Sequence, residues 1–168
     1  MDLQYFVDKK LTFVLIKRNR VIYKSKKQRL APLLFCLGKY KAQMRGATVF
    51  DKVVGRAAAL LLVYGGVKKV MAPLISRGAL AILKRGGAEV EYGERVENIL
   101  NRLGDDLCSM EKLSQGKNAF KFAKIMKIRY NISRRKDSSR LAKIIKGQES
   151  ADFYLIGSKI WLKAEVAK

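Results

Sequence analysis

The side chains best suited to chemistry in this sequence are one thiol and two carboxylates. Cys108 and Glu111 lie three residues apart, a spacing that brings two side chains to one face of a helix. A thiol beside a carboxylate suits nucleophilic or proton-transfer chemistry. We therefore take Cys108, Glu111 and Asp51 as the candidate catalytic residues. The chain has no histidine, which excludes imidazole-based mechanisms such as the Ser-His-Asp triad.

Four further polar residues are candidates for binding a small ligand: Lys52, Ser76, Asn101 and Arg102. Ser76 directly follows a predicted strand, and open α/β sheets bind ligands beyond the carboxyl ends of their strands. The free N–H groups at helix starts favour anions, and Lys52 and Arg102 add positive charge. Structural explanations stay open: helix capping for Asp51 and Ser76, a turn for Asn101, and solvation for the cations.

The element expected to position these residues is an almost wholly apolar stretch over 46–66. Asp51 can cap a helix that continues through 53–64, where Arg56 is an exception among apolar and small side chains. Gly65-Gly66 can end this helix, because glycine adopts the left-handed conformation that a helix end needs. A helix that is apolar on most sides must be buried on most sides. We expect it at the centre of an α/β domain.

A strand, a helix and a second strand follow this central helix. The strands are predicted over 67–72, ending at Pro73, and over 88–92, and the helix over 77–85 with Ser76 as its cap. Short connections of this kind make the two strands parallel and the crossover right-handed.

The flanking segments add shorter elements. Apolar β-rich runs predict a hairpin, and other runs predict short helices and a pair of strands near the end of the chain. The expected ranges are 11–16 and 21–23 for the hairpin, 30–37, 94–100 and 107–113 for helices, 101–106 for a loop, and 152–166 for the last strands. The segment 118–132 mixes apolar residues and lysine without a clean period.

Composition sets the broad class of the protein. The chain has 168 residues, 49% of them hydrophobic, which suits one domain or a domain with an appendage. No apolar run is long enough to cross a membrane as a helix, and the start of the chain lacks the pattern of a secretory signal. Two cysteines without a CxxC motif suit a reducing compartment, so we expect a cytoplasmic protein without membrane contact.

The charge balance favours polyanionic partners. There are 36 basic and 14 acidic residues, a net charge of +22. Residues 117–168 alone hold 14 Lys and Arg against 4 Asp and Glu, or +10. Six aromatic residues are interleaved with these cations, as in proteins that bind single-stranded nucleic acid, although core packing also explains such spacing. They are Phe120, Phe122, Tyr130, Phe153, Tyr154 and Trp161.

Several motifs resemble one family in order and spacing. They read GATVFDKVVGRAAALLLVYGGV, LISRGALAIL, VEYG and NRLGDDLCSMEK, and the family is that of domain of unknown function 1893, uncharacterised prokaryotic proteins. The resemblance covers about 11–113 and implies a cytidine deaminase-like three-layer α/β/α sandwich with a mixed sheet. Ser109, where the family pattern has proline, and the basic tail are departures. We divide the chain into this domain, 1–115, and a basic C-terminal extension, 116–168.

The resemblance also implies where a deaminase would hold zinc, near Asp51 and at 76–79. A zinc deaminase has His or Cys with a nearby Glu at the first position and PCxxC at the second. Neither position here holds a cysteine or a histidine, so we expect no catalytic zinc and no other cofactor. The resemblance places the start of the Asp51 helix beside Ser76. We expect the seven candidate residues to converge there on a small-ligand pocket that uses hydrogen bonds and charge.

Three functions stay open at this stage. The first is a metal-free relative of the deaminases that binds a nucleobase-like or nucleotide-like ligand, with or without catalysis. The second is an RNA-binding protein that uses its basic surface and tail. The third is a structural or regulatory partner protein without a ligand. The sequence leaves the oligomeric state undetermined.

Overall fold

A computed structural model describes residues 1–134, 153–156 and 159–162, with side chains as far as residue 127. The chain divides into two units, Met1–Ala123 and Lys124–Lys168. The first unit contains the sheet and the candidate site. In the second, β7 (Phe153–Ile156) pairs antiparallel with β8 (Lys159–Leu162), as the sequence predicted for this segment.

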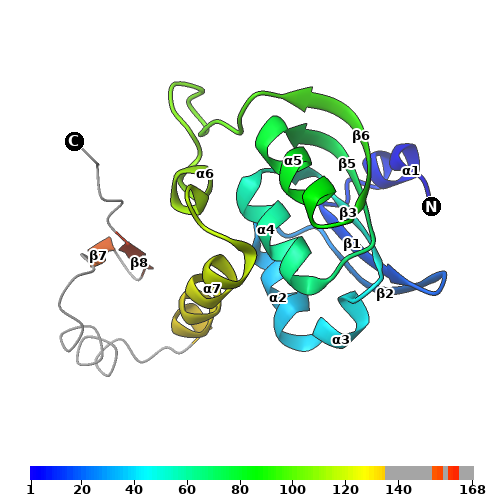
Figure 1. The fold of residues 1–168 in the computed structure, drawn as a ribbon, viewed down its shortest axis with the longest axis horizontal. Coiled ribbons are helices and arrows are strands. Elements are labelled where there is room, and N and C mark those ends of the chain that lie inside the picture. Colours follow the sequence, from blue (N-terminus) through cyan, green and yellow to red (C-terminus); the bar gives the residue numbers. More distant parts are fainter. Residues whose placement is uncertain (135–152, 157–158, 163–168) are drawn as a thin grey trace. The chain divides into compact units, whose positions relative to one another are not determined.

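The first unit is built on a mixed six-stranded sheet (Figure 1). Its strands are β1 (Phe13–Lys17), β2 (Arg20–Ser25), β3 (Thr48–Asp51), β4 (Val53–Val54), β5 (Lys69–Ser76) and β6 (Glu89–Val96). The hairpin β1–β2 is antiparallel, and β1 is also antiparallel to β3. Strands β3, β5 and β6 are parallel. The predicted hairpin and the predicted parallel strand pair are both confirmed.

Strands β3 and β4 pair one after the other with the same side of β5, as one interrupted strand would. Thr48 lies opposite Lys69 and Val53 lies opposite Leu74, so the register along β5 is the same on both sides of Lys52. The helix predicted from Asp51 therefore begins later, at Arg56. Asp51 continues the ladder of β3 and the β-branched pair Val53–Val54 extends it, and these pairings prevail over the capping that was expected of Asp51.

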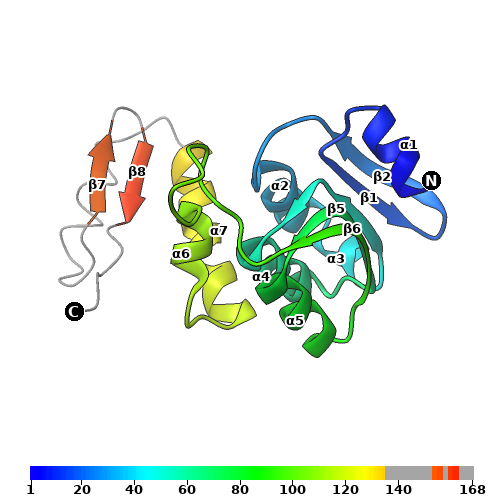
Figure 2. The same cartoon turned by 90° about the horizontal axis from the view of Figure 1, so that it is seen from above.

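The described residues form seven helices, some of which cover the two faces of the sheet (Figures 1 and 2). They are α1 (Leu3–Asp8), α2 (Ala31–Lys39), α3 (Lys41–Met44), α4 (Arg56–Gly65), α5 (Arg77–Arg85), α6 (Ser109–Ser114) and α7 (Ala119–Arg134). On one face Phe6 of α1 packs with Val14, Phe50 and Met71. The opposite face carries α4 with α2 and α5 against it. Right-handed crossovers between strands in the order β3, β5, β6 place α4 and α5 on that same face.

The central helix α4 is as buried as its composition predicts. Six consecutive residues, 57–62, are buried, and Gly66 ends the helix in the left-handed conformation with φ of 70°. Gly65 and Gly86 let neighbours approach closely, because a Cβ on Gly86 would lie 2.6 Å from the Val63 side chain. Small residues thus allow α4 and α5 to pack side by side.

Two boundaries around β5 and β6 differ from the prediction. Strand β5 continues through Pro73 instead of ending there. Strand β6 extends to Val96, over residues for which a helix was predicted from 94. The reason is the pairing opposite Pro73: Gly93 has no side chain, and a Cβ there would lie 2.9 Å from the Pro73 carbonyl oxygen. The glycine lets the two strands stay in register past a residue that has no N–H to donate.

We predict that Gly93→Ala destabilises the protein. The added methyl would meet the Pro73 carbonyl at 2.9 Å, so β6 must move away from β5, at a cost of about 1–3 kcal/mol. Gly38→Ala is the matched control, because Gly38 lies in α2 with nothing near its missing Cβ and alanine favours helix by about 0.5–1 kcal/mol. Urea unfolding of both variants measures the effect. Equal stability of the two would contradict the close approach of Gly93 to Pro73.

Candidate functional site

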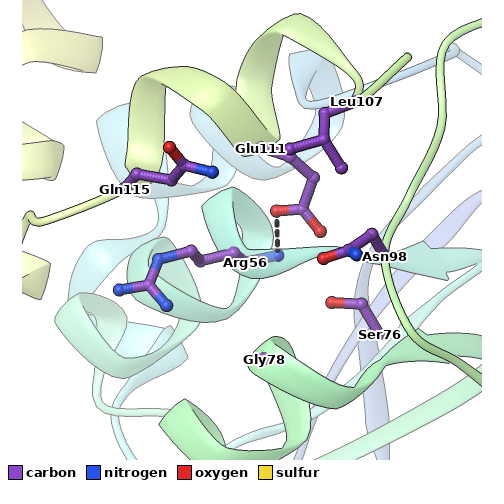
Figure 3. A pocket seen from close by; sticks show the side chains of 7 residues that line it. All are labelled: Arg56, Ser76, Gly78, Asn98, Leu107, Glu111 and Gln115. Carbon is purple, nitrogen blue, oxygen red and sulfur yellow. Dashed lines mark hydrogen bonds between the residues drawn. The ribbon is translucent and has the colours of Figure 1, made fainter. Parts of the chain in front are cut away.

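A small pocket lies where the starts of α4 and α5 face helix α6 (Figure 3). Its volume is about 110 Å³. The polar lining consists of Arg56, Ser76, Asn98, Glu111 and Gln115, and Gly78 and Leu107 complete it. Ser76 is the last residue of β5, so the pocket is at the carboxyl end of the central parallel strand. This is the position where open α/β sheets bind ligands.

Glu111 is the acid of this pocket, and it is buried at 6% exposure. Its Oε2 accepts a hydrogen bond of 2.8 Å from the backbone N–H of Arg56, the first residue of α4 (Figure 3). Its Oε1 accepts a longer bond of 3.4 Å from the Ile99 N–H. The N-cap residue of α4 is Gly55, which has no side chain to offer. A carboxylate from a distant helix therefore takes over the capping of α4 and interacts favourably with the helix dipole.

Gly55 makes room for this arrangement. A Cβ at position 55 would lie 3.0 Å from both Glu111 Oε1 and the Ile99 side chain. Any larger residue would push the carboxylate away from the helix start. The glycine and the glutamate, 56 residues apart in the sequence, thus act together: Gly55 leaves the space in which Glu111 caps α4.

Arg56 connects the same two helices through its side chain. Its Nε donates to the Ser114 carbonyl at 3.3 Å, and the buried Ser114 hydroxyl donates to the Glu111 carbonyl at 2.8 Å. Helix α6 is therefore tied to α4 by a side chain from each partner. The guanidinium lies beside the first turn of α5, with Nη1 4.0 Å from the place of a Gly78 Cβ. It is the positive charge among the residues that line the pocket.

Ser76 caps α5, as the sequence predicted. It is 1% exposed, and its Oγ accepts from the Ala79 N–H at 3.2 Å. The Ser76 hydroxyl can still donate a hydrogen bond of its own. Together with the Arg56 guanidinium and the Asn98 and Gln115 amides, it gives the pocket several donors, a set suited to a small anionic or polar group.

Asp51 does not line this pocket. It is the last residue of β3 and is 9% exposed. Burial raises the pKa of its carboxyl to about 7, and a hydrogen bond from the Val53 backbone N–H acts in the opposite direction. Lys52, next along the chain, is exposed, and its backbone N–H donates to the Thr12 carbonyl.

Asn101 shapes a surface loop. Its Oδ1 accepts from the backbone N–H groups of Leu103 and Gly104, and its Nδ2 donates to Asp105 at 2.7 Å. All its described side-chain bonds are within the loop, in agreement with the turn interpretation. Arg102 is exposed in the same loop. Neither side chain lines the pocket.

The two cysteines are both free and differ in their surroundings. Cys36 is fully buried in α2, and burial raises the pKa of its thiol to about 12, as expected of an inert core residue. Cys108 is half-buried at the start of α6, where its backbone N–H donates to the Ile99 carbonyl. Its neighbour Leu107 lines the pocket, but Cys108 does not.

The structure thus brings together Ser76 and Glu111 of the seven predicted residues and adds three polar residues that sequence reasoning missed. Arg56 had a signal, because it is a cation inside an otherwise apolar run. Asn98 and Gln115 had no such signal in the sequence. They line the pocket because of the path that the chain takes after β6, which local sequence patterns do not predict.

The pocket and its surroundings do not fit zinc. Among the residues that the structure describes, no group of three His, Cys, Asp or Glu side chains could hold a metal ion. The positions that the family resemblance implied for zinc hold Asp51 and the 76–79 segment, which offer one carboxylate and no thiol or imidazole. The absence of zinc from the protein itself stays a prediction.

The chain belongs to the family of domain of unknown function DUF1893, whose model matches residues 3–129. The crystal structure of a DUF1893 family protein from Thermotoga maritima is similar, with 28% identity, a TM-score of 0.67, and coverage of 74% of this chain and 84% of the other. The match extends beyond the 11–113 stretch that carried the resemblance. The predicted α/β fold with a mixed sheet is confirmed.

Two further solved structures match over parts of the chain. RibD from Acinetobacter baumannii matches with 25% identity, a TM-score of 0.42, and coverage of 70% of this chain and 33% of RibD. The diaminohydroxyphosphoribosylaminopyrimidine deaminase/reductase from Thermotoga maritima matches with 17% identity, a TM-score of 0.41, and coverage of 49% of this chain and 29% of the enzyme. This chain spans about a third of either protein.

No curated protein matches this chain. No helix among the described residues is long and apolar enough to cross a membrane.

We predict that Glu111→Ala lowers the free energy of unfolding by about 2 kcal/mol, because α4 loses its cap and a buried space opens. The matched control is Glu97→Ala, whose carboxylate is 63% exposed and pairs with Arg77 at 2.7 Å. An exposed pair contributes at most about 1 kcal/mol. Urea unfolding compares the two, and equal losses would contradict capping of α4 by Glu111.

We also predict that Asp51 makes stability depend on pH. The carboxyl has a pKa of about 7 when folded, against an ordinary 3.8. Its contribution to the free energy of unfolding is therefore fully present below about pH 4 and is lost as the pH rises to about 7. The loss is on the order of a few kcal/mol. Asp51→Asn keeps an acceptor oxygen and cannot ionise, so this variant should lose less stability between pH 5 and pH 8. Urea unfolding at four pH values tests this, and parallel curves for both proteins would refute it.

Proposed function

We propose that this protein binds a small, anionic, nucleotide-like ligand in the pocket between α4, α5 and α6. The observation that carries the proposal is the convergence of the Arg56 guanidinium with the Ser76-capped start of α5 at the carboxyl end of β5. A phosphate group is the natural partner for such a combination, since arginine and helix starts both favour anions.

The size of the pocket sets which part of the ligand it accepts. A volume of about 110 Å³ is below the usual range for a whole drug-sized ligand, about 300–1,000 Å³. One phosphate or one edge of a base would enter, and the rest of the ligand would lie outside. The Asn98 and Gln115 amides carry both donors and acceptors, which suits a base edge. Lys52, Asn101 and Arg102 stay proposed ligand contacts for the part outside.

Catalysis by Cys108, Glu111 or Asp51 stays a prediction. Glu111 is the member of this set that lines the pocket, and both its oxygens accept backbone N–H bonds. A proton transfer through Glu111 would have to compete with these bonds. This favours binding over catalysis as the function to test first. A cytoplasmic location, favoured by two free cysteines, belongs to the same proposal.

RNA binding is the alternative function, and charge supports it. The net charge is +22, and residues 117–168 contribute +10 of it. Of the aromatic residues considered for stacking, Phe122 is buried in the core, whereas Phe120 is 68% exposed. The side chains of Tyr130, Phe153, Tyr154 and Trp161 lie outside those that the structure describes. The tail remains a proposed RNA contact on its charge alone.

We predict that Arg56→Gln weakens ligand binding. Calorimetric titration of the full chain with AMP, CMP and orthophosphate should give heat of binding for at least one. Loss of the charged donor should lower its affinity about 10- to 100-fold. Arg85→Gln is the matched control, because Arg85 is the last residue of α5 and the pocket lies at the start of that helix. Absence of binding to all three at 10 mM, about the weakest affinity of interest, or equal binding by both variants would refute the proposal.

A further inference from the structure

A run of positive charge extends through the first third of the chain. Residues 9–50 contain twelve Lys and Arg residues and no Asp or Glu. All but one of these cations are exposed, the exception being the half-buried Lys17. The segment comprises the hairpin β1–β2 and the helices α2 and α3, within the unit Met1–Ala123.

The hairpin and the two helices are joined by side-chain contacts. The Tyr23 ring of β2 packs on the rings of Phe35 and Tyr40, with centroids 5.0 and 6.2 Å apart. The Lys17 ammonium donates to the Arg45 carbonyl and so ties β1 to the end of α3. We call residues 17–29 and 39–45 the hairpin surface.

Aromatic rings hold some of these cations in place. The Lys39 ammonium lies 5.8 Å from the centroid of the Phe35 ring and 5.5 Å from that of Tyr40. The Lys41 ammonium lies 4.0 Å from the centroid of the Tyr64 ring and donates to its hydroxyl. Cation–π contacts limit the motion of these side chains. A partner would find part of the charge already ordered.

The backbone also shows that basic residues occupy unusual positions here. Four described residues other than glycine have positive φ, and all belong to this part of the chain: Lys10, Arg18, Asn19 and Arg29, with φ of 51°, 49°, 59° and 62°. Glycine and asparagine favour this conformation, and basic residues adopt it only with strain. Arg18 even sits in the tight β1–β2 turn, where Asn-Gly is preferred. Such residues are candidates for function because local folding does not favour them.

The exposed acids of the sheet lie at its opposite edge. Strand β2 forms one edge, and β6, which pairs with β5, forms the other. Strand β6 and the residue after it carry Glu89, Glu91, Glu94 and Glu97. This separation of charge gives the unit a basic end and an acidic end. A long polyanion would be drawn to the first and repelled by the second.

We propose that the hairpin surface binds nucleic acid through its phosphate backbone. A chain of phosphates can contact many of these exposed cations at once, which a single anion cannot do, and no acid interrupts them along residues 9–50. A membrane fits less well, because the three rings are half-buried against one another and do not project for insertion. A second copy also fits less well, because Glu91 and Glu97 at the acidic edge already pair with Lys69 and Arg77. The inference is independent of the pocket.

The test measures binding of the full chain to a labelled single-stranded RNA by fluorescence anisotropy, over a range of salt concentrations. Lys24→Gln with Lys27→Gln removes two exposed cations of the hairpin surface. Lys84→Gln with Arg85→Gln removes two exposed cations elsewhere in the unit, and Lys143→Gln with Lys146→Gln removes two from the tail. Thermal unfolding of all three variants verifies that they fold.

Each lost phosphate contact should reduce affinity about fivefold at 0.1 M salt and lower the salt slope by about 0.7. The hairpin variant should therefore lose about 25-fold and the other two far less. Equal losses for all three variants would show diffuse attraction and overturn the proposal, as would a loss confined to the tail variant. Binding to anionic vesicles without binding to RNA would instead assign the surface to a membrane. Salt-sensitive self-association lost only in the hairpin variant, without RNA binding, would assign it to a second copy.

Discussion

Strand β5 is hydrogen-bonded in parallel on both of its sides, to β3 and β4 on one and to β6 on the other. This pairing determines the rest of the unit Met1–Ala123. Parallel neighbours require crossovers, and right-handed crossovers place α4 and α5 on one face with both helix starts at the same edge. The pocket follows from this geometry, because Ser76 is the last residue of β5 and Arg56 lies two residues beyond β4.

The starts of α4 and α5 lie together at the carboxyl end of the parallel strands, which creates a local excess of unsatisfied N–H groups. The chain satisfies them in different ways. Helix α5 uses a local cap, Ser76, whereas α4 begins after a glycine and takes its cap from Glu111 on α6. The distant cap has a consequence that a local one does not: it fixes α6 against the sheet domain and so closes one side of the pocket. The hydrogen bond from the Arg56 N–H to the Glu111 carboxylate therefore both caps α4 and holds the pocket together.

The parts of the fold that depend on local chemistry were predictable from the sequence. The left-handed Gly66, the Ser76 cap and the bounds of α5 follow from neighbouring residues alone. The start of α4 was predicted too early because Asp51 satisfies the local rule for a cap, while its strand pairing depends on β1 and β5. The capping of α4 by Glu111 could not be read from the sequence at all, since it joins residues 55 positions apart. The family resemblance placed the start of the Asp51 helix beside Ser76, and it implied no contact between Glu111 and Arg56.

Charge separates the two ends of the sheet in a way that bears on which anions can reach the pocket. Several acidic residues are close in sequence to residues that line the pocket. They are Glu94 and Glu97 and, in the following loop, Asp106. Some of this charge is neutralised: Glu97 pairs with Arg77, and the hydrogen bond from Lys112 holds the pKa of the Asp106 carboxyl below its usual range. The small anion proposed for the pocket would contact the Arg56 guanidinium directly. A polyanion would meet the remaining acids along its length and would be directed to the β2 edge instead. One distribution of charge is thus compatible with both proposals, a small anion in the pocket and a polyanion on the hairpin surface.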